Sequence, residues 1–267
     1  MKYINKKYLN VHSFNQKYAR NKPFPHIVFD NFIDKNLIEN IFLEFPSLEK
    51  LKGHITFQNR REIKLASRGS SQLSPAAKLL LGYLNSDVFL KYLQTLTNIK
   101  ETLISDPYLE GGGYHEIKKN GLLEVHVDFN KHFFIDLDRR VNLLLYVNKN
   151  WESKWGGSLE LYNKNNLKIP VKTIDPIFNR CVIFNTTSES YHGHPKPLIC
   201  PKSVSRKSIA LYYYSVGRPF KERNNVHSTV FRPSLGKSPN RYLNRIKKIL
   251  KLFVPPILLE LKNKIIP

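Results

Sequence analysis

Residues 123–129, Leu-Glu-Val-His-Val-Asp-Phe, alternate between apolar and polar side chains. In a β-strand this alternation places the side chains of His126 and Asp128 on one face, about 7 Å apart along the backbone. An imidazole and a carboxylate so placed supply two of the three protein ligands of a two-histidine, one-carboxylate metal site. Taken alone, such a triplet is more often a pair of solvated polar residues, so the prediction depends on a third ligand elsewhere.

A candidate third ligand follows 66 positions after His126, in the segment Ser190-Tyr191-His192-Gly193-His194-Pro195. This segment comes after the apolar run 181–185, which predicts a buried strand. His192 and His194 are alternatives for the role. Two imidazoles and one carboxylate form a facial triad, which leaves open positions on a non-haem Fe(II) for substrate and oxygen.

A basic residue beside a hydroxyl follows fourteen positions after His192, where Arg206-Lys207-Ser208 opens an apolar, tyrosine-rich run. Arg206 and Ser208 share one face of the expected strand. A guanidinium holds a carboxylate through two parallel hydrogen bonds, and the hydroxyl adds another. We therefore expect this pair to anchor an acidic cosubstrate.

The elements that must position these residues are short strands. Between residues 102 and 216, runs rich in Val, Leu, Ile, Tyr and Phe are separated by glycine-containing turns. This pattern of short apolar runs and turns predicts a mainly β fold, an antiparallel sandwich or barrel such as a jelly roll. The clearest predicted strands are 141–147, 158–162, 181–185 and 208–215.

Helices are expected before this β region. After an extended segment at 24–32, apolar residues at helical spacing predict a helix over 35–45, capped by Asp34. Pro75 opens a second predicted helix over 75–84, and a third covers 86–96. We expect these helices to pack on the β core.

The two terminal segments are strongly basic. Residues 1–22 are polar and are expected to form a poorly ordered basic arm. Residues 217–267 are expected to form a basic amphipathic extension with a helix that starts at Ser238-Pro239. Such a helix can lie on an anionic membrane surface, hold an acidic polymer or nucleic acid, or pack its apolar face on the domain.

The composition limits the partners and the compartment. The 43 basic residues outnumber the 21 acidic residues among 267, which gives a net charge of +22 and favours acidic partners. Cys181 and Cys200 provide neither a disulfide framework nor a zinc-site spacing. With no apolar leader segment and no run long enough to span a bilayer, we expect a cytoplasmic protein, free or peripheral to the inner face of a membrane.

Three histidines and a glycine run receive structural interpretations. Gly111-Gly112-Gly113 lacks the Lys-Ser/Thr sequel of a phosphate-binding loop and is interpreted as a turn. His115, His132 and His227 have no evident partners in the sequence, so we interpret them as surface or structurally satisfied residues.

Taken in order, these motifs resemble the 2-oxoglutarate and Fe(II)-dependent oxygenases, particularly their prolyl-4-hydroxylase-like branch. The resemblance covers residues 23–216 and also rests on the segments Pro23–Val28, Arg140–Asn148 and Trp155–Leu161. It implies a double-stranded β-helix (jelly-roll) core over 101–216, with helical support over 23–100.

The resemblance also implies roles for individual residues. His126, Asp128 and His192 would bind Fe(II), with His192 preferred over His194 because the family ligand usually precedes the glycine. Arg206 would pair with the distal carboxylate of 2-oxoglutarate, assisted by Ser208. The implied cosubstrates are 2-oxoglutarate and O2, with ascorbate as a reductant.

Two departures from the prolyl hydroxylase pattern leave alternatives open. Prolyl hydroxylases use a lysine where this chain has Arg206, which weakens prolyl hydroxylation as the specific reaction. They also place a cosubstrate-binding tyrosine nine positions before the first ligand, where this chain has Ile117. The residues that can take its place are Asn142, Tyr146 and Tyr114.

The leading functional hypothesis is a dioxygenase that hydroxylates a peptide, amino-acid or glycan/lipid-linked substrate and releases succinate and CO2. The alternative is a jelly-roll binding module that uses its basic surface on an anionic polymer or membrane, without oxygenase turnover. A nucleic-acid demethylase comes third, because the run after Arg206 lacks a second closely spaced arginine.

Overall fold

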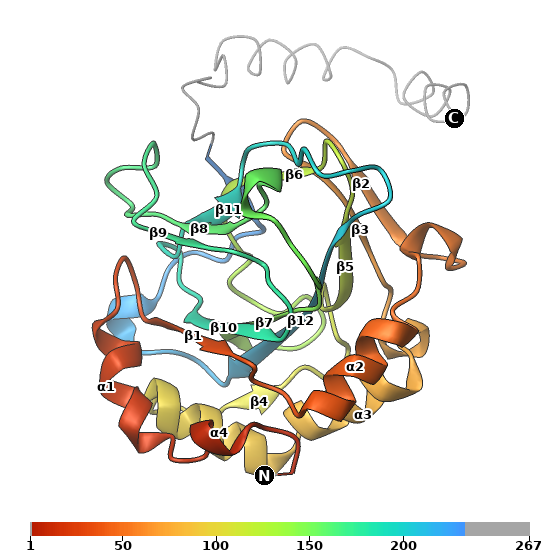
Figure 1. Ribbon diagram of the computed structural model, residues 1–267. Helices are drawn as coiled ribbons and strands as arrows, with labels where there is room; N and C mark the ends of the chain where they lie inside the picture. The colour runs from red at the N-terminus through yellow and green to blue at the C-terminus, as the bar shows by residue number, and fades with distance from the viewer. Residues whose placement is uncertain (1, 233–267) are drawn as a thin grey trace, which may run out of the picture. The chain divides into compact units, whose positions relative to one another are not determined.

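One curled antiparallel sheet of thirteen strands organises residues 2–232, the part of the chain that the computed structural model describes (Figure 1). The strands are β1 (His26–Asp30), β2 (Ile55–Gln58), β3 (Glu62–Ala66), β4 (Ile104–Ser105), β5 (Gly113–Ile117), β6 (Leu122–Val127), β7 (Asp138–Tyr146), β8 (Leu159–Leu161), β9 (Lys172–Ile174), β10 (Arg180–Asn185), β11 (His192–His194), β12 (Arg206–Ser215) and β13 (Val230–Phe231). Their main path is β1-β10-β7-β12-β5-β3-β6-β11-β8-β9, with β13 beside β6, β2 beside β3 and β4 beside β12. The curl sets β6, β11, β8 and β9 opposite β1, β10, β7 and β12 (Figure 1), which confirms the predicted jelly-roll core.

The helices pack on the outer side of the wall formed by β1, β10, β7 and β12 (Figure 1). The α-helices are α1 (His12–Arg20), α2 (Lys35–Glu44), α3 (Pro75–Leu84) and α4 (Asp87–Thr97), and short 3-10 turns are η1 (Lys6–Tyr8), η2 (Leu48–Lys50), η3 (Ser70–Gln72), η4 (Ser153–Trp155) and η5 (Phe220–Glu222). The three predicted helices are confirmed as α2, α3 and α4. Their starts are set by the side chains of Asp34, Ser74 and Ser86, each of which accepts a hydrogen bond from a backbone N–H of the first turn.

The prediction of a poorly ordered N-terminal arm was wrong. Residues 12–20 form α1, and Tyr18 on this helix is fully buried. The Tyr18 hydroxyl donates to Asn185 Oδ1 at 2.6 Å, and Tyr8 packs its ring against Phe29 of β1. The side chains of Tyr8 and Tyr18 thus hold this polar, basic segment to the domain. The composition of the segment alone does not predict these contacts.

The register of the central strands fixes which side chains face the interior of the curl. Tyr146 of β7 lies opposite Ser208 of β12, and Ser208 lies opposite His115 of β5. Because neighbouring residues in register share a face, these three side chains form a row across the sheet. On the other wall, His192 of β11 lies opposite His126 of β6. The fold therefore brings segments far apart in the sequence to one interior.

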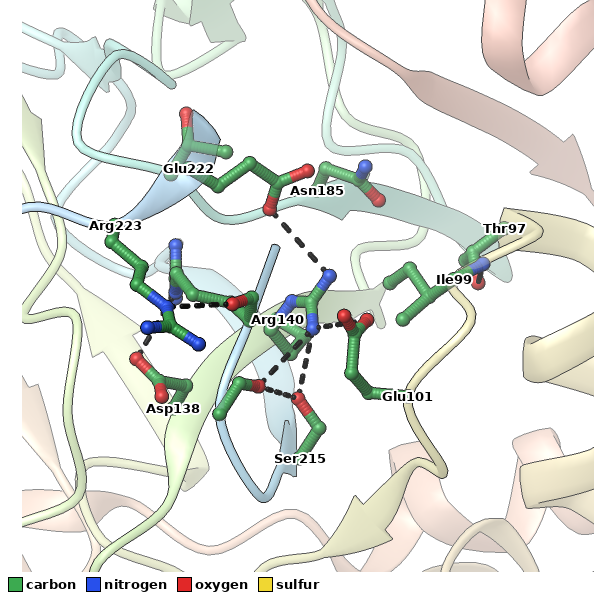
Figure 2. Close-up of polar contacts among 12 residues, drawn as sticks. Thr97, Ile99, Glu101, Asp138, Arg140, Asn185, Ser215, Glu222 and Arg223 are labelled. Atoms are coloured by element: carbon green, nitrogen blue, oxygen red, sulfur yellow. Dashed lines mark hydrogen bonds and ion pairs between the residues drawn. The ribbon is translucent and has the colours of Figure 1, made fainter. Parts of the chain in front are cut away.

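The chain after Gly217, which the sequence assigned to the C-terminal extension, continues the domain as far as Arg232. Figure 2 shows the polar contacts that hold it: the Arg140 guanidinium bonds to Glu101, Ser215 and the Gly217 carbonyl, and lies 3.5 Å from Glu222. Residues 230–231 then add β13 to the sheet beside β6.

The predicted helix after Ser238 lies outside the described residues. Within residues 2–232, no helix is both long and apolar enough to cross a membrane.

We expect Tyr18→Ala to lower the free energy of unfolding by about 3–5 kcal/mol, the usual cost of deleting a large buried aromatic side chain. The measurement is urea denaturation. Leu43→Ala on α2 is the matched control, because Leu43 is 76% exposed and its loss should change stability by less than about 0.5 kcal/mol. Equal, small effects of both substitutions would show that α1 does not pack on the domain.

Candidate metal and cosubstrate site

Three predicted ligands meet at one point inside the curl. His126 on β6, Asp128 just after β6 and His192 on β11 each offer an atom within 4.8 Å of the others. Asp128 Oδ1 lies 3.5 Å from His126 Nε2, and Asp128 Oδ2 lies 3.5 Å from His192 Nε2. His194, the alternative ligand, is not part of this cluster. We call His126, Asp128 and His192 the triad.

Backbone carbonyls set the orientation of both triad imidazoles. His126 Nδ1 lies 2.8 Å from the Glu124 carbonyl, and His192 Nδ1 lies 2.8 Å from the Ser190 carbonyl. A carbonyl only accepts, so each Nδ1 must carry the proton and donate it. In an uncharged ring, Nε2 then keeps its lone pair directed toward the cluster, which is the tautomer that a metal ligand requires.

The triad carboxylate is held by two residues of β7. Asn142 Nδ2 donates to Asp128 Oδ2 at 2.7 Å, and Arg139 Nη2 lies 3.2 Å from the same oxygen. Arg139 also donates to Asn142 Oδ1, at 3.0 Å from Nε and 2.8 Å from Nη2. The fully buried guanidinium stacks over the ring of Tyr212, 3.5 Å from its centroid. Asn142, expected near the cosubstrate, therefore positions Asp128, and sequence reasoning missed Arg139.

Charge and burial together set the protonation of the triad. Burial works to raise the pKa of Asp128, but Arg139, His192 and His126 outweigh it and hold that pKa well below the usual range. Burial and the neighbouring His126 lower the pKa of His192 to about 4. At neutral pH the structure thus presents an ionised carboxylate and an uncharged His192 imidazole.

A buried guanidinium lies at the start of β12. Arg206 Nε donates to the Gly157 carbonyl at 2.6 Å, and Nη2 donates to the Tyr146 hydroxyl at 3.1 Å. Among residues 2–232, no carboxylate forms an ion pair with Arg206, whose pKa is lowered by burial. A buried charge without a counter-charge is costly, so the site is built for an anion.

A glycine makes room for this guanidinium. A Cβ atom on Gly157 would come within 2.5 Å of Leu198 Cδ2 and 3.0 Å of Arg206 Cδ, and its φ of +74° also favours glycine. Gly157, just before the predicted strand 158–162, therefore has a definite role beside Arg206.

The residues predicted to bind the cosubstrate lie on two different faces of the sheet. Tyr146 and Ser208 are buried on the interior face beside Arg206. Tyr114 is on the opposite face, where its hydroxyl bonds to Ser74 Oγ at 2.9 Å and its ring packs on Phe45. Because alternate strand residues point to opposite faces, His115 rather than Tyr114 faces the interior. Placing Tyr114 at the cosubstrate was therefore wrong.

The other two histidines are satisfied by neighbours, as interpreted from the sequence. His132 Nε2 lies 3.2 Å from Asp106 Oδ1, and His227 Nε2 lies 2.7 Å from Ser188 Oγ. His227 also donates its backbone N–H to Asn130 Oδ1 at 2.9 Å, close behind the triad residue Asp128.

Aromatic rings cover the triad. The Phe184 ring lies 4.9 Å from the His192 ring, and the Phe231 ring of β13 lies 5.4 Å from the His126 ring. A cavity of about 390 Å³, lined in part by Phe24, Tyr162 and Ser190, opens beside the loop that leads to His192.

Comparisons with known proteins agree with this geometry. Residues 112–214 match the family model described as the 2OG-Fe(II) oxygenase superfamily. The chain is 26% identical to Prolyl 3-hydroxylase OGFOD1 of Mus musculus over 249 residues, which is 90% of this chain and 40% of the mouse protein. The Xenopus laevis protein of the same name is 27% identical over 176 residues, 64% of this chain and 31% of its own length. The chain thus spans less than half of these relatives.

Solved structures share the fold. A prolyl hydroxylase from Trichoplax adhaerens, in complex with a hypoxia inducible factor oxygen degradation domain peptide fragment, superposes with a TM-score of 0.56 at 20% identity, covering 77% of this chain and 89% of that one. A Pseudomonas putida prolyl-4-hydroxylase gives a TM-score of 0.54 at 14% identity, covering 78% of this chain and 100% of that one.

Members of the matched superfamily use Fe(II), 2-oxoglutarate and O2. The family match spans β5 to β12, the strands that carry the triad and Arg206, and the fold around them is that of prolyl hydroxylases. Residues 112–214 of this chain thus resemble the 2-oxoglutarate and Fe(II)-dependent oxygenase superfamily, and the fold around them is shared with prolyl hydroxylases.

Proposed function

We propose that this chain is an Fe(II)- and 2-oxoglutarate-dependent dioxygenase that hydroxylates a peptide or protein substrate and releases succinate and CO2. The observation that carries the proposal is the triad, with two oriented Nε2 lone pairs and an ionised carboxylate within 4.8 Å of one another. The peptide substrate is supported by the names of the mouse and frog relatives and by the peptide complex of the Trichoplax enzyme.

The donor set fits a divalent iron. Two neutral imidazoles and one carboxylate are the ligands that suit non-haem Fe(II) and leave open positions on it. His126, Asp128 and His192 would hold the metal, and Arg139 with Asn142 would keep the Asp128 carboxylate ionised and oriented. When bound, Fe(II) with 2-oxoglutarate and O2 supplies the oxidising chemistry of the family.

Arg206 would bind the distal carboxylate of 2-oxoglutarate. Its guanidinium is already fixed by the Gly157 carbonyl, so little ordering is needed when an anion binds. The Tyr146 hydroxyl accepts a hydrogen bond from Arg206 and keeps its own proton to donate to the carboxylate. Ser208, opposite Tyr146 in the sheet, adds a second hydroxyl on the same face.

Buried apolar side chains limit the access of water to this interior. Leu159 and Leu161 of β8, with Val182 and Phe184 of β10, form a buried cluster with the Tyr146 ring. Charge-assisted hydrogen bonds strengthen where water is excluded, so this wall supports both the triad and Arg206.

The predicted reductant, location and macromolecular partner are also proposals. We propose ascorbate as the reductant, a cytoplasmic location, and an anionic membrane surface or acidic polymer as the partner of the basic C-terminal segment. These proposals rest on the resemblance and on the charge of the chain.

We expect the wild-type chain, mixed anaerobically with Fe(II) and 2-oxoglutarate, to show the charge-transfer absorption of a 2-oxo acid chelated to Fe(II). Asp128→Ala should abolish it, because one of three protein ligands is lost. Arg206→Ala should weaken 2-oxoglutarate binding by more than tenfold while metal binding is retained, because a buried charged donor to the carboxylate is removed.

The control for that experiment is Lys131→Ala, which removes a half-buried cation that is paired with Asp136 and not with the triad, and it should leave the absorption unchanged. Absence of the absorption in the wild-type chain, with Asp128→Ala no different in metal affinity, would refute the oxygenase proposal and favour a binding module.

We expect Arg139→Met to weaken divalent metal binding at pH 7 by roughly 10- to 100-fold, the usual effect of removing a residue that orients a ligand. Loss of the guanidinium removes the main charge that favours ionised Asp128, so the carboxyl pKa rises and metal is lost at a higher pH than in wild type. Metal titration by calorimetry between pH 5 and 8 measures both effects.

Arg139→Lys is the matched comparison, because it keeps the charge but not the planar fork. It should preserve the pH at which metal is lost better than Arg139→Met does. Identical pH profiles for wild type and Arg139→Met would show that Arg139 does not control the ionisation of Asp128.

A further inference from the structure

His194 is a buried histidine that the triad does not use. It is 3% exposed, and neither ring nitrogen has a hydrogen-bond partner within the described residues. Buried polar atoms are nearly always paired, and leaving one unpaired costs free energy. An imidazole with both nitrogens unpaired therefore indicates a missing partner, such as a bound ligand.

The strand that carries His194 directs it into the cosubstrate region. His194 follows His192 by two residues on β11, so both side chains lie on the interior face, about 7 Å apart along the strand. A ligand chelated at the triad that extends along β11 would reach His194.

The backbone around His194 is fixed. A Cβ atom on Gly193 would come within 2.8 Å of the Leu123 carbonyl oxygen and 2.9 Å of the Glu124 carbonyl oxygen. The glycine thus lets β11 lie close against β6 at a shift in the strand register. Because this contact holds the strand, His194 has little freedom to turn its ring toward solvent.

Arg206 contacts the segment that leads into the strand beside β11, because its Nε donates to the carbonyl of Gly157, two residues before β8. Gly193 of β11 lies opposite Glu160 of β8 in antiparallel pairing, so His194 lies toward the end of β8 that is nearer to Gly157. Both side chains are buried, and within the described chain neither has an anionic partner. A carboxylate between them would satisfy the unpaired imidazole and compensate the unpaired guanidinium.

We propose that His194 donates a ring N–H to the distal carboxylate of 2-oxoglutarate, beside Arg206, Tyr146 and Ser208. A carboxylate presents about four acceptor positions, and these four side chains supply four donors. His194 thereby selects a 2-oxo acid that has a second carboxylate at this distance from the metal. This inference rests on the proposed function, because it assigns a residue to the same cosubstrate.

The test measures ligand binding to the full chain loaded with Ni(II), by calorimetry. The two probes are 2-oxoglutarate and pyruvate, a 2-oxo acid without the distal carboxylate. His194→Phe should weaken 2-oxoglutarate binding by roughly tenfold or more, the effect of losing a hydrogen bond to a charged group. Its affinity for pyruvate and for Ni(II) should equal that of wild type.

Two further variants separate hydrogen bonding from packing. His194→Leu also lacks a donor but is smaller than phenylalanine, so it should show the same selective loss without added bulk. His194→Gln keeps an N–H donor and should recover most of the affinity for 2-oxoglutarate.

Three results would overturn the inference. They are unchanged 2-oxoglutarate affinity in both His194→Phe and His194→Leu, an equal loss for pyruvate and 2-oxoglutarate, or a loss of Ni(II) affinity, which would make His194 a metal ligand. Failure of the proposed function gives a different result, since the wild-type chain would then bind Ni(II) without binding 2-oxoglutarate.

Discussion

The site depends on keeping one largely buried carboxylate ionised. Asp128 has little access to solvent, and burial alone would favour its protonated form. The neighbouring Arg139 reverses that preference, and Asn142 fixes the carboxylate oxygen that both residues contact. Because Arg139 and Asn142 come from one strand that pairs with both β10 and β12, the central sheet itself determines the charge state of the triad.

A second constraint is the buried charge of Arg206. Its described contacts are a carbonyl and a hydroxyl, which orient the guanidinium without neutralising it. The protein therefore tolerates the cost of a buried, uncompensated guanidinium charge in the same interior that the triad side chains face. Such a cost is typical of binding sites, in which the compensating charge arrives with the ligand.

The parts of the fold with local signals were predictable from the sequence, and the parts that depend on distant contacts were not. The helix starts and the polar face of β6 follow from neighbouring residues, whereas the hydroxyl that bonds to Arg206 is that of Tyr146, 60 residues away on β7. Tyr114 was misplaced because both faces of β5 are buried, so its sequence does not show which side faces the interior. Arg139 was missed because it lies on β7 whereas its partner Asp128 follows β6. The spacing of these two residues in the sequence does not indicate that the guanidinium is buried. Tyr18 holds α1 through Asn185, a contact across most of the chain.

The charges of the triad and of Arg206 favour binding of the metal first and of the anionic cosubstrate second. Arg139 compensates Asp128, and His192 is uncharged at neutral pH, so these groups together present lone pairs with little net charge. A divalent cation held there would make the interior strongly positive, since Arg206 already contributes one uncompensated charge. A dianionic 2-oxo acid would offset two of these three positive charges, with one carboxylate near the triad and the other near Arg206 as proposed. The affinity of the interior for such an anion should therefore depend on prior occupation of the triad, a coupling that follows from electrostatics without any change in the fold.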